Sequence, residues 1–302
     1  MTVDSRGVAG GRPPWPGQYP ERARDSAPAD SPAAGHGRRR PRRRWGDRLL
    51  FAWTWLIIIW LALPIAVMII FSFNNPHGRF NFTWVGFTLK WYGPHLLDYP
   101  SLTAAMENSL IVAFAATVGS VVLGTLVGLA LGKYRFRGLG TANLVQFAAI
   151  SAPDIVLASS LLAFFVTLRV PLGLPTIIVA HIMFCLSFVA VTVRARVLTL
   201  DRSLEEAARD LGAGPWATFR LVTLPLIFPG VLAGALLAFA ISIDDFVVTS
   251  FVSGSTQTFP LWIWSATRNG LPPQVDVLGT LIFVAGLVIA ATSALFGRRS
   301  TR

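Results

Sequence analysis

Long apolar runs alternate with polar segments along most of the chain. Six of these runs reach about the 20 residues that a helix needs to cross a hydrocarbon core. This pattern predicts an all-α polytopic membrane protein with six transmembrane helices. The expected spans, numbered one to six in chain order, cover about 49–73, 108–132, 142–168, 175–198, 230–252 and 276–297.

The two ends of the chain differ from the apolar runs. Residues 1–37 are rich in Pro, Gly, Ala, Ser and Arg and contain few aliphatic side chains. Such a composition cannot bury enough apolar surface to offset the entropy lost on ordering. We therefore predict a disordered, basic cytoplasmic tail at 1–45, a membrane domain at 46–298 with a polar loop at 199–229, and a short cytoplasmic tail at 299–302.

Charge indicates a membrane topology rather than a nucleic-acid partner. The net charge is +11, but only 14% of the residues are charged and 53% are hydrophobic. Most Lys and Arg residues near the span ends fall on one side, including an arginine-rich segment directly before span one. Cytoplasmic loops carry such a positive excess. Both termini are therefore expected in the cytoplasm, with the arginines of the tail against anionic lipid headgroups.

Small residues recur every four positions in two of the spans. Such faces let helix backbones approach closely in lipid, which predicts tight helix packing within or between subunits. The single cysteine, Cys185, lies in an apolar run, so we expect it to pack as a small hydrophobic side chain. The small residues are Gly124, Gly128 and Gly132 in span two and Gly230, Gly234, Ala238 and Ser242 in span five.

The polar loop between spans four and five contains signals for two short helices. Ser203 followed by Glu206 fits a capping box, and Gly212 suits the left-handed position just past a helix end. Pro215 stands where the first residue of a second helix tolerates proline. Two later prolines are expected to stop that helix before span five begins. They are Pro225 and Pro229.

The spacing within this loop resembles a known motif. Glu206-Ala207-Ala208 is followed after three residues by Gly212 and after nine more by Val222-Thr223-Leu224-Pro225. This is similar to the EAA loop of permease subunits in binding-protein-dependent ABC importers, although that family usually has Ile at the position of Val222. In the family the loop forms a cytoplasmic coupling helix that docks on the ATPase subunit; an ordinary amphipathic hairpin is the alternative. The resemblance implies a role in ATPase coupling for Ser203, Glu205, Glu206, Ala207, Ala208, Gly212, Leu224 and Pro225.

Three carboxylates stand inside the apolar runs. A charge near the bilayer centre costs about 2.5–3.5 kcal/mol, so Asp154, Asp244 and Asp245 are candidates for a substrate pathway. Asp154 follows Pro153 where a broken helix can restart, and a satisfied cap is the alternative there. In a continuous span five, Asp245 would share the small-residue face and Asp244 would point about 100° away. For this pair the alternative is an interhelical hydrogen bond, and for His181 we expect packing rather than ligand binding.

Two external segments are rich in aromatic side chains. Trp and Tyr collect at the membrane interface, so we expect residues 74–107 to anchor there. Docking of a solute-binding protein is the alternative there. A short surface helix is expected near 259–264, and for it anchoring and docking are equal alternatives.

The sequence contains no pattern for catalysis. It has no paired His and Cys spacing for a metal, no nucleophile motif and no loop resembling a Walker A sequence. We therefore expect no enzyme activity, no metal site and no cofactor bound by this chain. If ATP drives the protein, ATP and Mg²⁺ must bind to a separate ATPase subunit.

Further segments look like the spermidine/putrescine branch of these importers, and specifically its second permease subunit. The resemblance covers about 46–298 and implies the type I ABC importer permease fold. Acidic groups along a path would suit a cationic amine, because a desolvated ammonium needs opposite charge. The matching segments are 81–92 (NFTWVGFTLKWY), 108–110 (NSL), 151–154 (SAPD) and 242–254 (SIDDFVVTSFVSG).

The resemblance also implies partners and a location. These are a second permease subunit, a pair of ATPase subunits and an extracytoplasmic solute-binding protein, all at a bacterial cytoplasmic membrane. An alternative within the same class is another small solute, such as iron, thiamine or sulfate. An alternative from a different class is an ATPase-independent channel or membrane scaffold.

Overall fold

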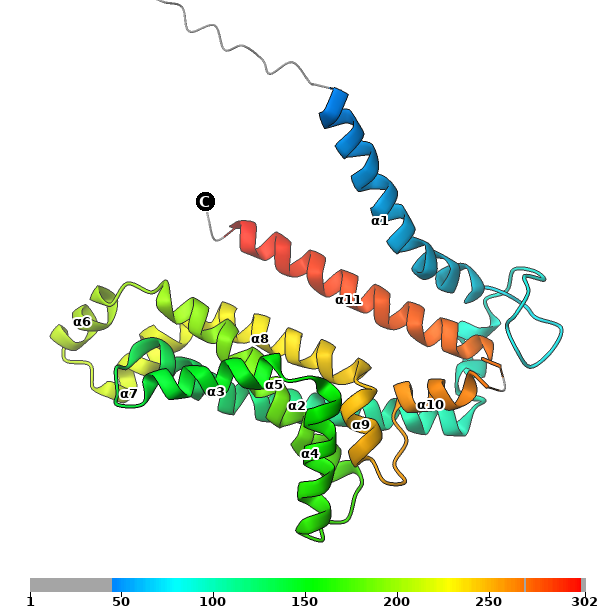
Figure 1. The fold of residues 1–302 in the computed structure, drawn as a ribbon. Helices are drawn as coiled ribbons and strands as arrows, with labels where there is room; N and C mark the ends of the chain where they lie inside the picture. Colours follow the sequence, from blue (N-terminus) through cyan, green and yellow to red (C-terminus); the bar gives the residue numbers. More distant parts are fainter. Residues whose placement is uncertain (1–44, 269, 300–302) are drawn as a thin grey trace, which may run out of the picture. The chain divides into compact units, whose positions relative to one another are not determined.

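The computed structural model describes residues 45–268 and 270–299, and most of these residues are helical (Figure 1). The expected tails at 1–45 and 299–302 lie outside the described residues, apart from Trp45 and Arg299. The α-helices are α1 (Trp45–Phe71), α2 (Pro100–Lys133), α3 (Leu139–Ser151), α4 (Asp154–Thr167), α5 (Leu174–Leu198), α6 (Ser203–Asp210), α7 (Pro215–Thr218), α8 (Leu224–Asp244), α9 (Val247–Val252), α10 (Phe259–Ala266) and α11 (Pro273–Arg299). Shorter elements are the 3₁₀ turns η1 (Lys90–Tyr92) and η2 (Pro94–Leu97) and the π turn η3 (Phe219–Thr223).

The chain divides into two compact units, and the boundary lies inside α1. The first unit ends at Ile59 and the second begins at Trp60. All the packing described below lies within the second unit. Four helical stretches are long and apolar enough to cross a membrane: α1, α2, α5 and the continuous stretch Pro215–Asp244. The pair α3 and α4 makes a fifth span if it counts as one, and α11 contributes a shorter apolar segment, Pro273–Ile289. The described residues therefore contain four or five such spans, compared with the six expected from the sequence.

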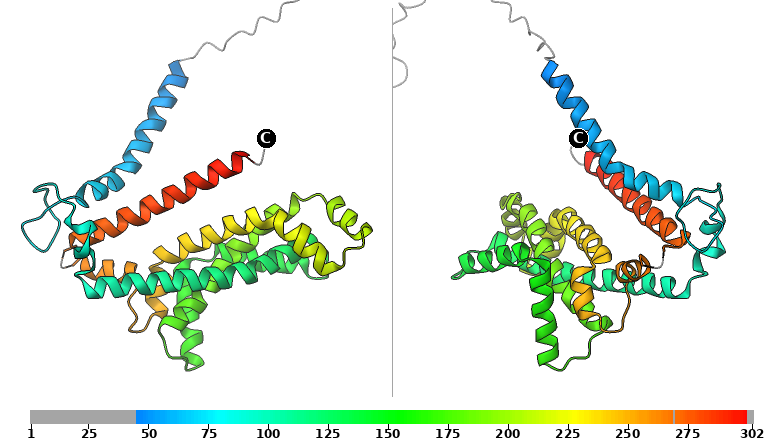
Figure 2. Two further views of the ribbon diagram at one scale, coloured as in Figure 1. Left: turned by 180° about the vertical axis from the view of Figure 1, so that it is seen from behind. Right: turned by 45° about the vertical axis from the view of Figure 1, so that its right-hand side comes forward.

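Helix α5 is the centre of the largest packed region, with α2 and α8 against it (Figure 2). The small-residue faces predicted for spans two and five both turn toward this helix. A Cβ atom added to Gly124 would lie 2.7 Å from Val189 Cβ, and one added to Gly128 would lie 2.8 Å from the Ala190 carbonyl oxygen. From α8, a Cβ atom on Gly234 would lie 3.3 Å from Val189 Cγ1. The close packing predicted from these faces is therefore confirmed, and it occurs within one chain.

A buried cluster along α5 fills the space around these contacts. Cys185 is fully buried in it, as expected for a small hydrophobic side chain. Its other buried members come from α2, α5 and α8, so three spans share one core. They are Leu129, Val189, Val193, Val197, Ile227 and Ala238.

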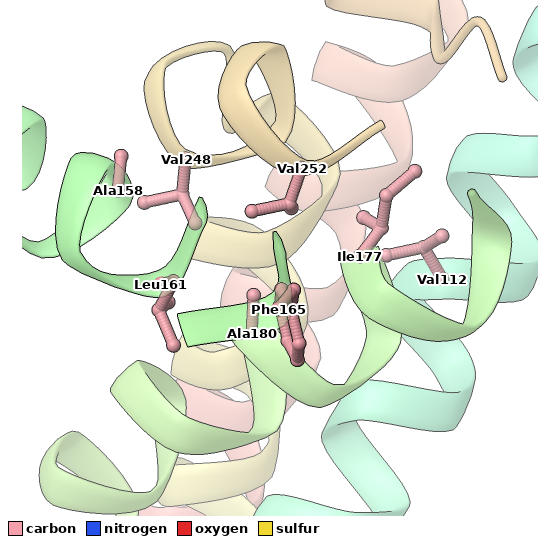
Figure 3. Packing of buried hydrophobic residues seen from close by; sticks show 8 residues of the cluster. All are labelled: Val112, Ala158, Leu161, Phe165, Ile177, Ala180, Val248 and Val252. Carbon is pink, nitrogen blue, oxygen red and sulfur yellow. The ribbon is translucent and has the colours of Figure 1, made fainter. Parts of the chain in front are cut away.

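Span three is broken rather than continuous. The chain bends by 104° between α3 and α4, with Ala152 and Pro153 at the break. Proline removes an amide donor and disfavours helix at the residue before it, which explains where the bend lies. The break predicted at this point is confirmed. Figure 3 shows the cluster that holds α4 in place, in which side chains of α4 gather with those of α2, α5 and α9: Val112, Ala158, Leu161, Phe165, Ile177, Ala180, Val248 and Val252.

Helix α2 begins earlier than predicted, at Pro100 instead of residue 108. Its first turns pack against α10, so the helix expected to lie free on the surface is partly buried, through Phe259 and Trp262. The Ser109 hydroxyl accepts a hydrogen bond from the Phe259 amide at 2.8 Å, and the Asn108 amide donates to the Gln257 carbonyl at 2.9 Å. Polar side chains near the start of α2 therefore fix the segment that leads into α10.

The prediction that Pro225 and Pro229 end a helix is wrong. The chain is helical from Pro215 to Asp244, with the π turn η3 joining α7 to α8. Pro225 lacks an amide at the junction of η3 and α8, where the π turn has already widened the helix. Pro229 lies inside α8, one turn further on. A wider turn beside prolines is a common way for a membrane helix to absorb a lost hydrogen bond.

A first prediction follows from the contact between α2 and α5. Gly124→Leu should lower the thermal stability of the protein in detergent markedly, because a new side chain meets Val189 and the Leu186 carbonyl within 3 Å. Overpacking of this kind costs about 1–3 kcal/mol or more. Gly286→Leu is the matched control, since an added Cβ there meets no heavy atom of the described chain within 4 Å beyond its immediate neighbours and the backbone of its own helix. Fluorescence-detected gel filtration after heating measures both, and equal midpoints would contradict the packing.

Candidate functional site

The polar loop lies beyond the start of α8 and carries α6 (Figure 1). Helix α6 covers Ser203–Asp210 and leaves most of its side chains exposed. Leu204 is 47% exposed and Leu211, just past the helix end, is 90% exposed. Exposed apolar side chains on a short helix give a surface suited to contact with another protein. Ala207 and Glu206 are exposed as well, whereas Ala208 is half-buried.

The capping box predicted for Ser203 and Glu206 does not form. Arg202 occupies the cap position without a side-chain hydrogen bond. Asp201 takes over this role, since its Oδ1 accepts a hydrogen bond from the Ser203 amide at 2.9 Å. The bond from the Ser203 backbone lowers the pKa of the Asp201 carboxyl. The prediction missed this because an Asp two residues upstream reaches the same end of the helix.

The end of α6 follows the prediction. Gly212 has a φ of 88°, in the left-handed region that favours glycine. The amide of Ala213 donates to the Ala208 carbonyl at 3.0 Å, which closes the helix end. Leu224 then begins α8 half-buried, and Pro225 is exposed beside it.

Glu205 points away from the exposed side of α6 and into the protein. Its carboxylate lies 2.6 Å from Lys133 Nζ, at the last residue of α2. The Thr223 hydroxyl, at the end of η3, donates to the same carboxylate at 2.6 Å. Burial raises the pKa of Glu205, but the Lys133 and Thr223 hydrogen bonds and the nearby positive charges outweigh it, so the pKa lies below its usual value. Lys133 directly follows the span expected at 108–132, and the sequence gave no sign of this contact.

A second polar site lies where α8 ends. The predicted continuous span over 230–252 is wrong, because α8 stops at Asp244 and α9 starts at Val247. The Asp245 carboxylate accepts hydrogen bonds from the Thr249 amide at 2.8 Å and from the Thr249 hydroxyl at 2.9 Å. It therefore satisfies donors that the break leaves at the start of α9.

His181 of α5 lies beside Asp245 and is 1% exposed. Its Nδ1 is 2.7 Å from the Ser242 hydroxyl, and its Nε2 is 2.9 Å from the Thr249 hydroxyl and 3.3 Å from Asp245 Oδ2. The packing expected for His181 is confirmed, and its polar partners join α5, α8 and α9. A polar side chain in an apolar run was the available signal, since such residues need partners in the membrane.

Asp244 is exposed and has different surroundings. It lines a cavity of about 420 Å³ between α8, α10 and α11. Two aromatic rings of this cavity, Phe246 and Trp264, lie 5.3 Å apart between centroids. A carboxylate next to aromatic faces is an arrangement that attracts organic cations. The remaining lining residues are Ile243, Phe259, Pro260, Ile263, Thr267, Gly279 and Ile282.

Asp154 is not part of either cluster. It is the first residue of α4, directly after Pro153, and it is exposed. The described part of the chain shows no side-chain hydrogen bond at this cap. The structure thus separates the three carboxylates that the sequence grouped together. Within the described residues, no group of three or more His, Cys, Asp and Glu side chains could hold a metal ion.

Comparison with known proteins gives consistent matches. Residues 120–301 match the family described as binding-protein-dependent transport system inner membrane component. The chain is 41% identical to the spermidine/putrescine transport system permease protein PotC of Escherichia coli K12, covering 82% of this chain and 92% of that protein. It is 38% identical to the putrescine transport system permease protein PotI of the same strain, covering 76% of this chain and 86% of that protein.

Solved structures share the fold. A bacterial ABC transporter for the import of alginate has a TM-score of 0.59 at 17% identity, covering 84% of this chain and 98% of that chain. The inward-facing MetNI methionine ABC transporter has a TM-score of 0.56 at 22% identity, covering 67% of this chain and 96% of that chain. The protein is accordingly a transport subunit rather than an enzyme. With its several apolar helices, the chain belongs to the family of inner membrane components of binding-protein-dependent transport systems, as a multi-pass membrane permease.

Proposed function

We propose that this chain is a permease subunit of an ATP-driven ABC importer that moves polyamines, spermidine or putrescine, into the cytoplasm. The observation that carries this proposal is the 41% identity to a spermidine/putrescine permease over 82% of the chain. The cavity beside Asp244 supports a cationic cargo, because a desolvated ammonium gains from a carboxylate and from aromatic faces.

The three carboxylates then have different roles along the pathway. Asp244 lines the cavity and faces the passing amine. Asp245 belongs to the same region but holds the break between α8 and α9 through its bonds to Thr249. Asp154 stands exposed at the break between α3 and α4, where a group from outside this chain can reach it.

Helix α6 is the coupling helix, and its exposed side makes the contact with the ATPase. It presents Leu204, Glu206 and Leu211 to an ATPase subunit, and Gly212 sets where the helix ends. ATP and Mg²⁺ bind to that subunit and not to this chain. A pair of ATPase subunits, a second permease subunit and an extracytoplasmic solute-binding protein complete the transporter. ATP binding draws the coupling helices together, and the spans then open toward the loaded binding protein.

The chain crosses a bacterial cytoplasmic membrane six times. The bent pair α3 and α4 serves as one span and α11 as the last, beside the four stretches long enough to cross unaided. The charge distribution supports cytoplasmic termini and a cytoplasmic polar loop. On the other side lie Arg79, Lys90, Arg169 and Arg268.

Topology can be tested by cysteine labelling in a Cys185→Ala background. His77→Cys and Ser255→Cys, both at exposed positions, should react with an impermeant maleimide on intact cells. Arg137→Cys, exposed in the loop between α2 and α3, should react only after permeabilisation. Reaction of the Arg137→Cys variant on intact cells would reverse the orientation.

The pathway role of Asp244 predicts that Asp244→Asn lowers the maximal rate of spermidine uptake several-fold. The amide keeps the shape of the side chain and removes the charge that faces the cavity. Uptake is measured in proteoliposomes with saturating binding protein, and complex assembly is measured in parallel. Asp98→Asn, which removes an exposed carboxylate paired with His95 outside the cavity, is the control and should leave uptake unchanged. Wild-type uptake by the assembled Asp244→Asn complex would reject the role.

The coupling role of α6 predicts that Gly212→Val abolishes ATP-driven uptake while the protein still inserts in the membrane. A β-branched residue at a φ of 88° costs about 1–3 kcal/mol, because its side chain clashes with the backbone there. Gly214→Val is the matched control, since Gly214 has a φ of −67° that valine adopts easily. Neither position has a described heavy atom within 4 Å of an added Cβ, so the pair isolates the backbone effect. Equal uptake and equal ATPase co-purification in both variants would remove the case for docking through α6.

A further inference from the structure

Glu205 and Glu206 are adjacent in α6 but have opposite surroundings. Glu206 is exposed, whereas the Glu205 side chain is only 16% exposed and forms an ion pair. A surface that docks on another subunit needs accessible side chains. Glu205 therefore makes its contacts within its own chain, although the EAA-type spacing groups it with the docking residues.

The contacts of Glu205 connect three separate elements. Lys133 Nζ, 26% exposed, lies 2.8 Å from Oε1 and 2.6 Å from Oε2 of the carboxylate, so α6 is tied to the last residue of α2. The Thr223 hydroxyl, 1% exposed, ties the same carboxylate to the turn that enters α8. Partly buried ion pairs with an added hydrogen bond are held more firmly than exposed ones.

The two helices reached in this way form the core of the protein. Both α2 and α8 pack against α5 through glycine faces. Because these contacts are close, the helices resist sliding past one another and move together as a rigid unit. The Glu205 carboxylate thus joins α6 to both α2 and α8, beside a longer hydrogen bond of 3.5 Å from the Arg202 guanidinium to the Lys133 carbonyl. A pocket of about 80 Å³ lies beside this carboxylate, and Lys133, Glu205 and Thr223 all line it.

We propose that Glu205 is a positioning residue that transmits the motion of α6 to α2 and α8 through Lys133 and Thr223, rather than a residue that docks on the ATPase. This inference rests on the proposed coupling role of α6. If the ion pair between Glu205 and Lys133 is lost, α6 still docks on the ATPase subunit. Its motion is then no longer passed on to α2 and α8. The complex should hydrolyse ATP without moving a matching amount of cargo.

The test uses the complete reconstituted transporter in proteoliposomes with saturating binding protein. Labelled spermidine uptake and phosphate release are measured together, which gives the number of amines moved for each ATP hydrolysed. The variants are Glu205→Gln, Lys133→Met, the two combined, and the charge exchange Glu205→Lys with Lys133→Glu. Asp98→Asn, which removes an exposed carboxylate outside α6, in the segment between α1 and α2, is the control.

Glu205→Gln and Lys133→Met should each lower uptake per ATP several-fold at normal assembly, with Asp98→Asn unchanged. The combined variant should be no worse than either one, and the charge exchange should restore part of the ratio, because the residues act as one pair. A wild-type ratio in assembled Glu205→Gln complexes overturns the proposal. So do losses from the two single variants that simply add.

If Glu205→Gln reduces the yield of the complex, Thr223→Val decides the question, since it removes one hydrogen bond and keeps the ion pair. A lowered ratio in that variant supports transmission, and a wild-type ratio rejects it. If the chain is not an ABC importer permease that couples through α6, the result differs. In that case the unmodified permease does not associate with an ATPase subunit at all.

Discussion

The close approach of α2 and α8 to α5 is the interaction on which the rest of the structure depends. In lipid there is little hydrophobic gain from bringing helices together, so backbone contact through small residues has to supply the attraction. Gly124 and Gly234 come from different helices and meet the same residue, Val189. One helix is thus held from two sides, and this places the residues of α5 that the polar sites need.

His181 shows how this core supports the breaks. Irregular backbone at membrane depth persists only where protein groups satisfy its hydrogen bonds. At the break after α8, Asp245 does so by accepting a hydrogen bond from the Thr249 amide, and His181 contacts both the Thr249 hydroxyl and the Asp245 carboxylate. The other broken segment, α4, packs directly against α9 in one buried cluster (Figure 3). The two interruptions therefore stabilise each other, and Asp244 is left free to line a cavity.

The polar loop is joined to this core at its other end. Helix α6 has few apolar contacts of its own and presents its side chains to solvent. Its attachment to α2 and to the start of α8 is made by the Glu205 carboxylate. Under the proposed roles, docking and transmission fall on different sides of one short helix, so a partner can hold the outer side while the inner side stays bound to the spans.

Much of the protein followed from the sequence, because the signals were local. Run length predicted membrane spans, proline predicted the bend before Asp154, and Gly212 predicted a left-handed helix end. The EAA-type spacing led to the family that the comparisons show. Each of these depends on a few neighbouring residues or on composition, which a single sequence contains.

Only the tertiary structure decided which polar groups meet. Lys133 and Glu205 are 72 positions apart, and His181 is 61 positions from Ser242, so neither contact leaves a pattern in the sequence. The break at Asp245 was missed for the same reason: its hydrogen bonds come partly from α5, and periodicity alone favoured a continuous helix. Hydrogen bonds and ion pairs act over a few ångströms in space, and the chain brings these side chains together only after its helices have packed.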